Sequence, residues 1–98
     1  MAEVTWTAEA EKWLKEVHDH IAADNPQAAM RVVEGIYEKV QVLERFPEFG
    51  HRYAAKPGQN VRILLYGHYL IPYLVKPDGN IDILGVFHGA LDIERYLL

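Results

Sequence analysis

Residues 61–87, VRILLYGHYLIPYLVKPDGNIDILGVF, decide the fold of this chain. Runs at 61–66, 69–75 and 81–87 are rich in β-branched and aromatic residues, which is typical of strands. Gly67-His68 and residues 76–80 (KPDGN) separate these runs and suit tight turns, so the stretch predicts a three-stranded antiparallel meander. Pro72 lies inside the middle run, and because proline has no N–H to give to a ladder, we expect a bulge or a local gap there.

The residues before this stretch have a helical period. Apolar residues recur at spacings of three and four in two segments, Ala10, Trp13, Leu14, Val17 and Ile21 in the first and Ala29, Val32, Val33, Ile36, Val40 and Leu43 in the second. Thr7 can cap a helix from residue 8 to about 23, and Asn25-Pro26 can start a second helix that ends at Phe46-Pro47. The two segments therefore predict an antiparallel helical hairpin.

Together these elements predict a single α+β domain over residues 1–98. Residues 3–7 read as a strand that joins the sheet, which gives an antiparallel sheet of about four strands with the hairpin on one face. Residues 48–60 read as a loop, and residues 90–98 could add a short terminal helix. The N-terminus lacks the pattern of a signal peptide, and no apolar stretch is long enough to span a membrane.

The composition excludes several kinds of chemistry. Cysteine and serine are absent, so disulfides, thiolate metal ligands and Ser or Cys nucleophiles are excluded. His18 and His20 are two residues apart on a predicted helix and cannot grip one metal ion, and we expect no metal or cofactor. The net charge is −4, with five basic and ten acidic side chains in residues 1–50, so we expect no direct sequence-specific DNA binding.

Several strings in this order resemble the RelE/ParE toxin family, and specifically its ParE-like branch. They are VTWT with its following helix, IAADNPQAA, LERFPEFG, the arginine in VRILLYGHYLIPYLV, and IDILGVFHGALDI. The resemblance implies a cytoplasmic toxin of a type II toxin–antitoxin (plasmid stabilisation) system, which is neutralised by a cognate antitoxin and inhibits growth by binding DNA gyrase. RelE-like members are instead ribosome-dependent mRNA endoribonucleases, and this remains the alternative.

Under the ribonuclease alternative, the resemblance assigns catalytic roles to Arg62, at the start of a strand, and His88, at the end of the last strand. The alternative interpretation of Arg62 is a structural bridge to an acidic helix residue such as Glu34 or Glu38. The chain departs from the family pattern at Leu91, where many relatives have arginine, and it offers only Lys56 in the loop. These departures favour an inhibitor that acts by binding.

A partner-binding surface is the second candidate site. A sheet covered by helices on one face leaves its other face and an edge for an amphipathic antitoxin segment. The candidate residues are aromatic or apolar: Tyr66, Tyr69, Tyr73, Tyr96, Leu97 and Leu98. The tail could instead close the core of the chain itself, and Trp6 and Trp13 are interpreted as core or antitoxin-facing residues.

Overall fold

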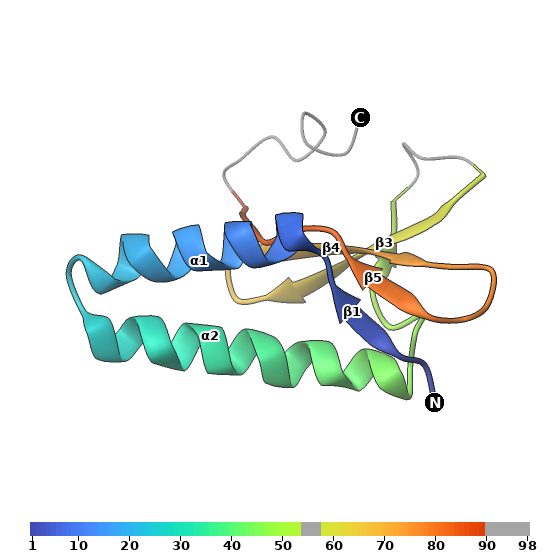
Figure 1. Ribbon diagram of the computed structural model, residues 1–98, viewed down its shortest axis with the longest axis horizontal. Coiled ribbons are helices and arrows are strands. Elements are labelled where there is room, and N and C mark those ends of the chain that lie inside the picture. Colours follow the sequence, from blue (N-terminus) through green and yellow to red (C-terminus); the bar gives the residue numbers. More distant parts are fainter. Residues whose placement is uncertain (54–57, 90–98) are drawn as a thin grey trace.

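The computed structural model describes residues 1–53 and 58–89 (Figure 1). Within these residues the elements are β1 (Val4–Trp6), α1 (Ala8–Ala22), α2 (Pro26–Gln41), a short 3-10 helix η1 (Val42–Glu44), β2 (His51–Arg52), β3 (Asn60–Tyr66), β4 (Tyr69–Val75), β5 (Ile81–Ile83) and β6 (Phe87–His88). Figure 1 shows α1 and α2 side by side and antiparallel, which confirms the predicted hairpin. The terminal helix expected at residues 90–98 lies outside the described residues.

Both helices begin at the predicted caps. The Thr7 hydroxyl accepts a hydrogen bond from the Ala10 amide at 3.1 Å, and the Asn25 side chain accepts one from the Ala28 amide at 3.1 Å. These bonds satisfy amides that the first helical turn leaves without a partner. The Thr7 hydroxyl also donates to the Ile83 carbonyl at 2.7 Å, so this cap ties α1 to the sheet.

The strands form one mixed sheet in the order β1-β5-β4-β3-β2, with β6 also paired to β4. The meander β3-β4-β5 is antiparallel, as predicted. The predicted fold class, a helical hairpin packed on a sheet, is confirmed, and the sheet differs in two details from the predicted antiparallel sheet of about four strands. β1 pairs in parallel with β5, with Val4 opposite Ile81, and the predicted loop contains a further short strand, β2.

Pro72 explains why the last predicted strand is split in two. The ladder with β3 passes Pro72 without a break, with Ile63 opposite it. On the other side of β4, the Pro72 carbonyl accepts a hydrogen bond from the Leu84 amide at 2.9 Å, but proline has no N–H to return. β5 ends at Ile83 and β6 begins at Phe87, so the expected local gap lies opposite Pro72.

The core lies between the helical hairpin and one face of the sheet. Its buried members come from both layers: Ala10 and Leu14 of α1, Ile36 and Val40 of α2, Leu43 of η1, and Leu64, Ile71, Tyr73, Ile81, Ile83 and Val86. The apolar positions that predicted the helices thus face the sheet, as an amphipathic helix requires. This packing fixes the sheet edge and the loop that carry the candidate sites.

Candidate functional site

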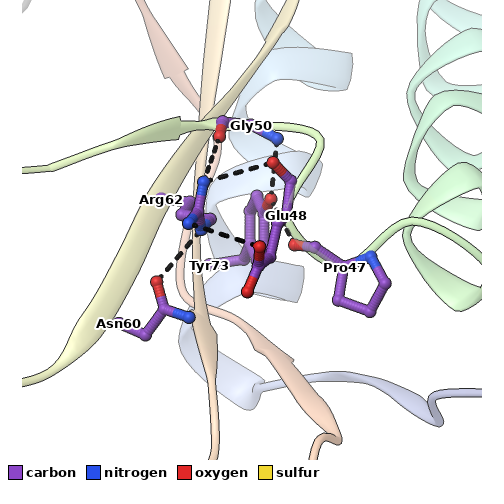
Figure 2. A network of polar contacts seen from close by, with 6 residues as sticks. All are labelled: Pro47, Glu48, Gly50, Asn60, Arg62 and Tyr73. Atoms are coloured by element: carbon purple, nitrogen blue, oxygen red, sulfur yellow. Dashed lines mark hydrogen bonds and ion pairs between the residues drawn. The ribbon is translucent and has the colours of Figure 1, made fainter.

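Arg62 holds the chain that follows α2 against the sheet (Figure 2). One terminal nitrogen of its guanidinium donates to the carbonyls of Glu48 at 3.1 Å and Gly50 at 3.0 Å. Its Nε donates to the Asn60 side chain at 3.0 Å, and its other terminal nitrogen lies 4.0 Å from the Glu48 carboxylate. The side chain is only 15% exposed, so most of its donors serve the protein itself.

Tyr73 holds the same segment from the next strand. Its hydroxyl donates to the Pro47 carbonyl at 2.7 Å and accepts from the Gly50 amide at 2.9 Å. Burial raises the pKa of this phenol above its ordinary value, although the Gly50 N–H opposes the rise. Residues 47–50 are therefore fastened by a set of polar contacts, here called the clasp, made by Arg62, Tyr73 and Asn60 (Figure 2).

The clasp corrects two predictions. Tyr73 was expected on a free partner-binding surface, but it is fully buried in the core. Arg62 bonds to other parts of the protein, as its alternative interpretation expected. Its partners are Glu48, Gly50 and Asn60, so the expected bridge to Glu34 or Glu38 is wrong.

Two phenylalanines stand out from the segment that the clasp fastens. Phe46 is 60% exposed and Phe49 is 57% exposed, on either side of Pro47. The ammonium of Lys39 lies 5.2 Å from the centre of the Phe49 ring, within the range of a cation–π contact. We call Phe46, Pro47 and Phe49 the aromatic platform. The sequence showed these residues only as a helix stop, because exposure cannot be deduced from an FPEF string.

A second feature is an apolar hollow of about 340 Å³ between α1, the start of β4 at Tyr69 and the end of β6 at His88. Its described lining residues are Trp13, Glu16, Val17, His20, Tyr69, Val86 and His88. The rings of Tyr69 and His88 meet edge to face with centroids 5.6 Å apart, and the His68 ring stacks on His88 at 6.1 Å. The structure therefore brings Tyr69, a predicted partner-binding residue, together with His88.

Tyr66 belongs to the helix side of the sheet. A Cβ atom on Gly35 would come within 1.9 Å of the Tyr66 hydroxyl, so the ring lies directly against the backbone of α2. The side chain is half-buried and packs against the core. Tyr96, Leu97 and Leu98, like Lys56 and Leu91, lie outside the described residues.

Arg62 and His88 do not share one site. Arg62 lies opposite Tyr73 on one side of β4, and His88 lies opposite Tyr69 on the other side. Four residues of strand separate these positions by about 13 Å, and two strand spacings add about 10 Å across the sheet. A single phosphate could not contact both side chains in this arrangement.

Comparison with known proteins supports this architecture. A model of the family described as "ParE toxin of type II toxin-antitoxin system, parDE" matches residues 4–93. The chain belongs to the ParE toxin family. It is 34% identical over 86 residues to "Putative toxin Y4kP" of Sinorhizobium fredii (strain NBRC 101917 / NGR234), an alignment that covers 88% of this chain and 86% of that protein.

A solved structure extends the likeness to three dimensions. The chain matches one titled "Chromosomal ParDE TA system from P. aeruginosa" with a TM-score of 0.75 and 28% identity, over 90% of this chain and 96% of the other. The ParE-like resemblance read from the sequence is thus confirmed. No helix in residues 1–53 and 58–89 has the length and apolar character needed to cross a membrane.

Proposed function

We propose that this ParE-family toxin acts in the cytoplasm by binding DNA gyrase, that a cognate antitoxin neutralises it, and that the pair serves plasmid stabilisation. The observation that carries the proposal is the family match over residues 4–93. Gyrase as the target is the action that the ParE-like resemblance implies. Growth inhibition then results from a protein–protein contact.

The geometry around Arg62 favours binding over RNA cleavage. Promotion of attack on a phosphate requires a cation whose N–H groups are free to meet the developing charge. Two of the Arg62 nitrogens are already bonded to Asn60, Glu48 and Gly50, and His88 lies on the other side of β4. Arg62 is better suited to hold the fold than to stabilise a transition state.

The hollow beside α1 is the best-supported antitoxin site among the described residues. Trp13, Val17 and Tyr69 give it apolar walls, while Glu16 and His20 place polar groups at its α1 side. Grooves of this kind accept the apolar face of an amphipathic helix. The proposed occupant is therefore an apolar side chain of the antitoxin, which keeps Tyr69 in the partner-binding role predicted for it.

The target is tested by adding the purified toxin in parallel to a gyrase supercoiling reaction and to a translation reaction with mapping of mRNA ends. We expect loss of supercoiling, restored by the antitoxin, and intact mRNA. Codon-linked mRNA cuts that disappear in His88→Ala would instead establish the ribonuclease alternative. Intact supercoiling at a large excess of toxin would refute the gyrase proposal.

The antitoxin site is tested with Val17→Glu, which places a carboxylate in the apolar hollow. Because a charge there must either be desolvated or exclude the antitoxin side chain, we expect the antitoxin Kd to rise at least roughly tenfold. Met30→Glu, on the exposed side of α2, is the matched control and should leave the Kd unchanged. Equal affinities for the two variants, measured by calorimetry, would place the antitoxin elsewhere.

A further inference from the structure

We propose that the aromatic platform is the surface with which the toxin grips its target, and that its occupant is an acidic segment of the target protein carrying an apolar side chain. This inference rests on the proposed function, because it assumes that the toxin acts by binding a protein. The contact with the target would then lie at the Val75 end of β4, away from the hollow at the Tyr69 end.

The platform is exposed, and yet its backbone is held in place. Large apolar side chains in water are unfavourable, and a rigid exposed pair typically marks an interaction site. Here the clasp holds the carbonyls of Pro47, Glu48 and Gly50 (Figure 2), which belong to the same short segment as Phe46 and Phe49. The Phe49 amide also donates to the Phe46 carbonyl at 3.0 Å, so the two rings stand on one short turn.

A fastened surface has less conformational entropy to lose when a partner binds. Ordering a flexible loop opposes association, whereas a preformed surface avoids most of that cost. Aromatic side chains also have only two rotatable bonds and provide large contact areas. The clasp therefore converts two exposed rings into a prepared docking site.

A groove with a volume of about 610 Å³ lies beside the platform. Its lining combines the platform with neighbouring strand and turn residues: Arg45, Phe46, Pro47, Glu48, Phe49, Val75 and Gly79. The walls are mainly apolar and include Val75 and the two phenylalanines. An aliphatic or aromatic side chain of a partner fits this groove.

The charged side chains near the platform favour an acidic partner. Lys39 contacts the Phe49 ring, Arg45 lines the groove, and Arg52 follows the fastened segment in β2. In residues 1–53 and 58–89 none of these three cations forms an ion pair with a carboxylate. Arg52 is the cross-strand neighbour of Arg62, an unfavourable pairing of like charges. Glu48, the one acid among the described residues that line the groove, has its carboxylate 4.0 Å from the Arg62 guanidinium.

Acids are nevertheless close by. Glu44 and Asp78 lie in an adjoining hollow around Met1, which Arg45 also borders. Within the part of the chain that the structure describes, the cations near the platform have no carboxylate partner, although the whole chain carries a net charge of −4. Carboxylates on the partner segment would neutralise these cations, so charge complementarity selects an acidic occupant.

The position of the platform separates it from the proposed antitoxin site. Val75 lines the platform groove and Tyr69 lines the hollow, at opposite ends of β4. Six residues of strand place them about 20 Å apart. Variants at the platform can therefore affect the target while the antitoxin site stays intact.

The experiment uses the full-length double variant Phe46→Ala/Phe49→Ala. We expect the concentration for half-inhibition of gyrase supercoiling to rise roughly tenfold or more, because truncated aromatic anchors dominate interface losses. Growth arrest on induction in bacteria should weaken in parallel at equal protein levels, while antitoxin affinity and the melting temperature stay at wild-type values. Arg45→Glu/Arg52→Glu should weaken inhibition in the same direction, and more strongly at low salt.

Met30→Ala/Leu65→Ala is the matched control, since both side chains are large, apolar and comparably exposed at 50% and 45%. Full inhibition by the platform variant would overturn the inference, as would equal loss in this control. Lost antitoxin binding with intact growth arrest would also overturn it, by making the platform an antitoxin site. If the wild type arrests growth without inhibiting gyrase, the gyrase proposal fails, and the growth readout alone decides the platform.

Discussion

The two ends of β4 are built on different principles. At the Val75 end, hydrogen bonds from Arg62 and Tyr73 fasten a turn that leaves two phenylalanines exposed to water. At the Tyr69 end, rings of Tyr69, His88 and Trp13 surround an apolar hollow. Directional polar contacts specify one backbone geometry, whereas apolar side chains repack at low cost. The contrast indicates a fixed surface at one end and an adaptable one at the other.

Gly50→Ala should give the largest effect on stability. A Cβ atom at residue 50 would lie 2.8 Å from both the Ile63 carbonyl oxygen and the Tyr73 ring, and neither can move freely. We expect a loss of about 3 kcal/mol in the free energy of unfolding, the upper range for overpacking. The matched control at the other end is Gly89→Ala, whose Cβ would meet the His68 carbonyl at 3.1 Å. Equal losses of unfolding free energy in Gly50→Ala and Gly89→Ala, measured by urea denaturation, would contradict the difference between the two ends of β4.

Arg62→Met should have the second-largest effect on stability. It keeps the apolar stem but leaves the carbonyls of Glu48 and Gly50 without their donor, at a cost of about 2 kcal/mol. Arg62→Lys should recover only part of this loss, because an ammonium cannot reproduce the geometry of the guanidinium. Arg52→Met, at the exposed cross-strand neighbour, should change the stability by less than about 0.5 kcal/mol. A full rescue by lysine would argue against a geometric role.

Tyr73→Phe should cost about 1.5 kcal/mol at neutral pH, because the Gly50 amide loses its acceptor and the Pro47 carbonyl its donor. Burial raises the folded-state pKa of Tyr73, so its contribution is complete below its unfolded pKa of about 10 and is lost as the pH rises through the higher folded value. The difference in the free energy of unfolding between the wild type and Tyr73→Phe should therefore become smaller above about pH 10.

Tyr69→Phe is the control for this pH dependence, since Tyr69 belongs to the hollow at the other end of β4. Denaturant midpoints of the wild type and of both variants are followed from pH 8 to 11. A gap that stays constant for Tyr73→Phe, or narrows equally for Tyr69→Phe, would disprove the assigned burial effect.

Glu48→Gln should give the smallest effect. The Glu48 side chain is 73% exposed and its carboxylate lies 4.0 Å from the Arg62 guanidinium, so solvent screens the pair. We expect a change within about 0.5 kcal/mol by thermal unfolding. A loss as large as that of Arg62→Met would mean that the carboxylate, and not the backbone carbonyls, carries the clasp.

The local features of the fold could be predicted from the sequence, and the long-range ones could not. The caps Thr7 and Asn25 bond to amides three residues away, so the local sequence is enough to predict them. The clasp joins Tyr73 to Pro47 across 26 residues, and no local pattern specifies that pairing. One signal was nevertheless present: Tyr73 alternates with Ile71 and Val75, so strand periodicity places it on their face, which is the core face.

The parallel pairing of β1 with β5 has a consequence for synthesis. Val4 pairs with Ile81, which is synthesised 77 residues later, and the Thr7 hydroxyl donates to the Ile83 carbonyl. The first strand can therefore pair only after most of the chain has been made. Contacts of such separation form late in folding, since a long loop must close first. Until residues 81–83 have been synthesised, β1 has no strand partner, so the order of translation itself delays the appearance of a finished toxin.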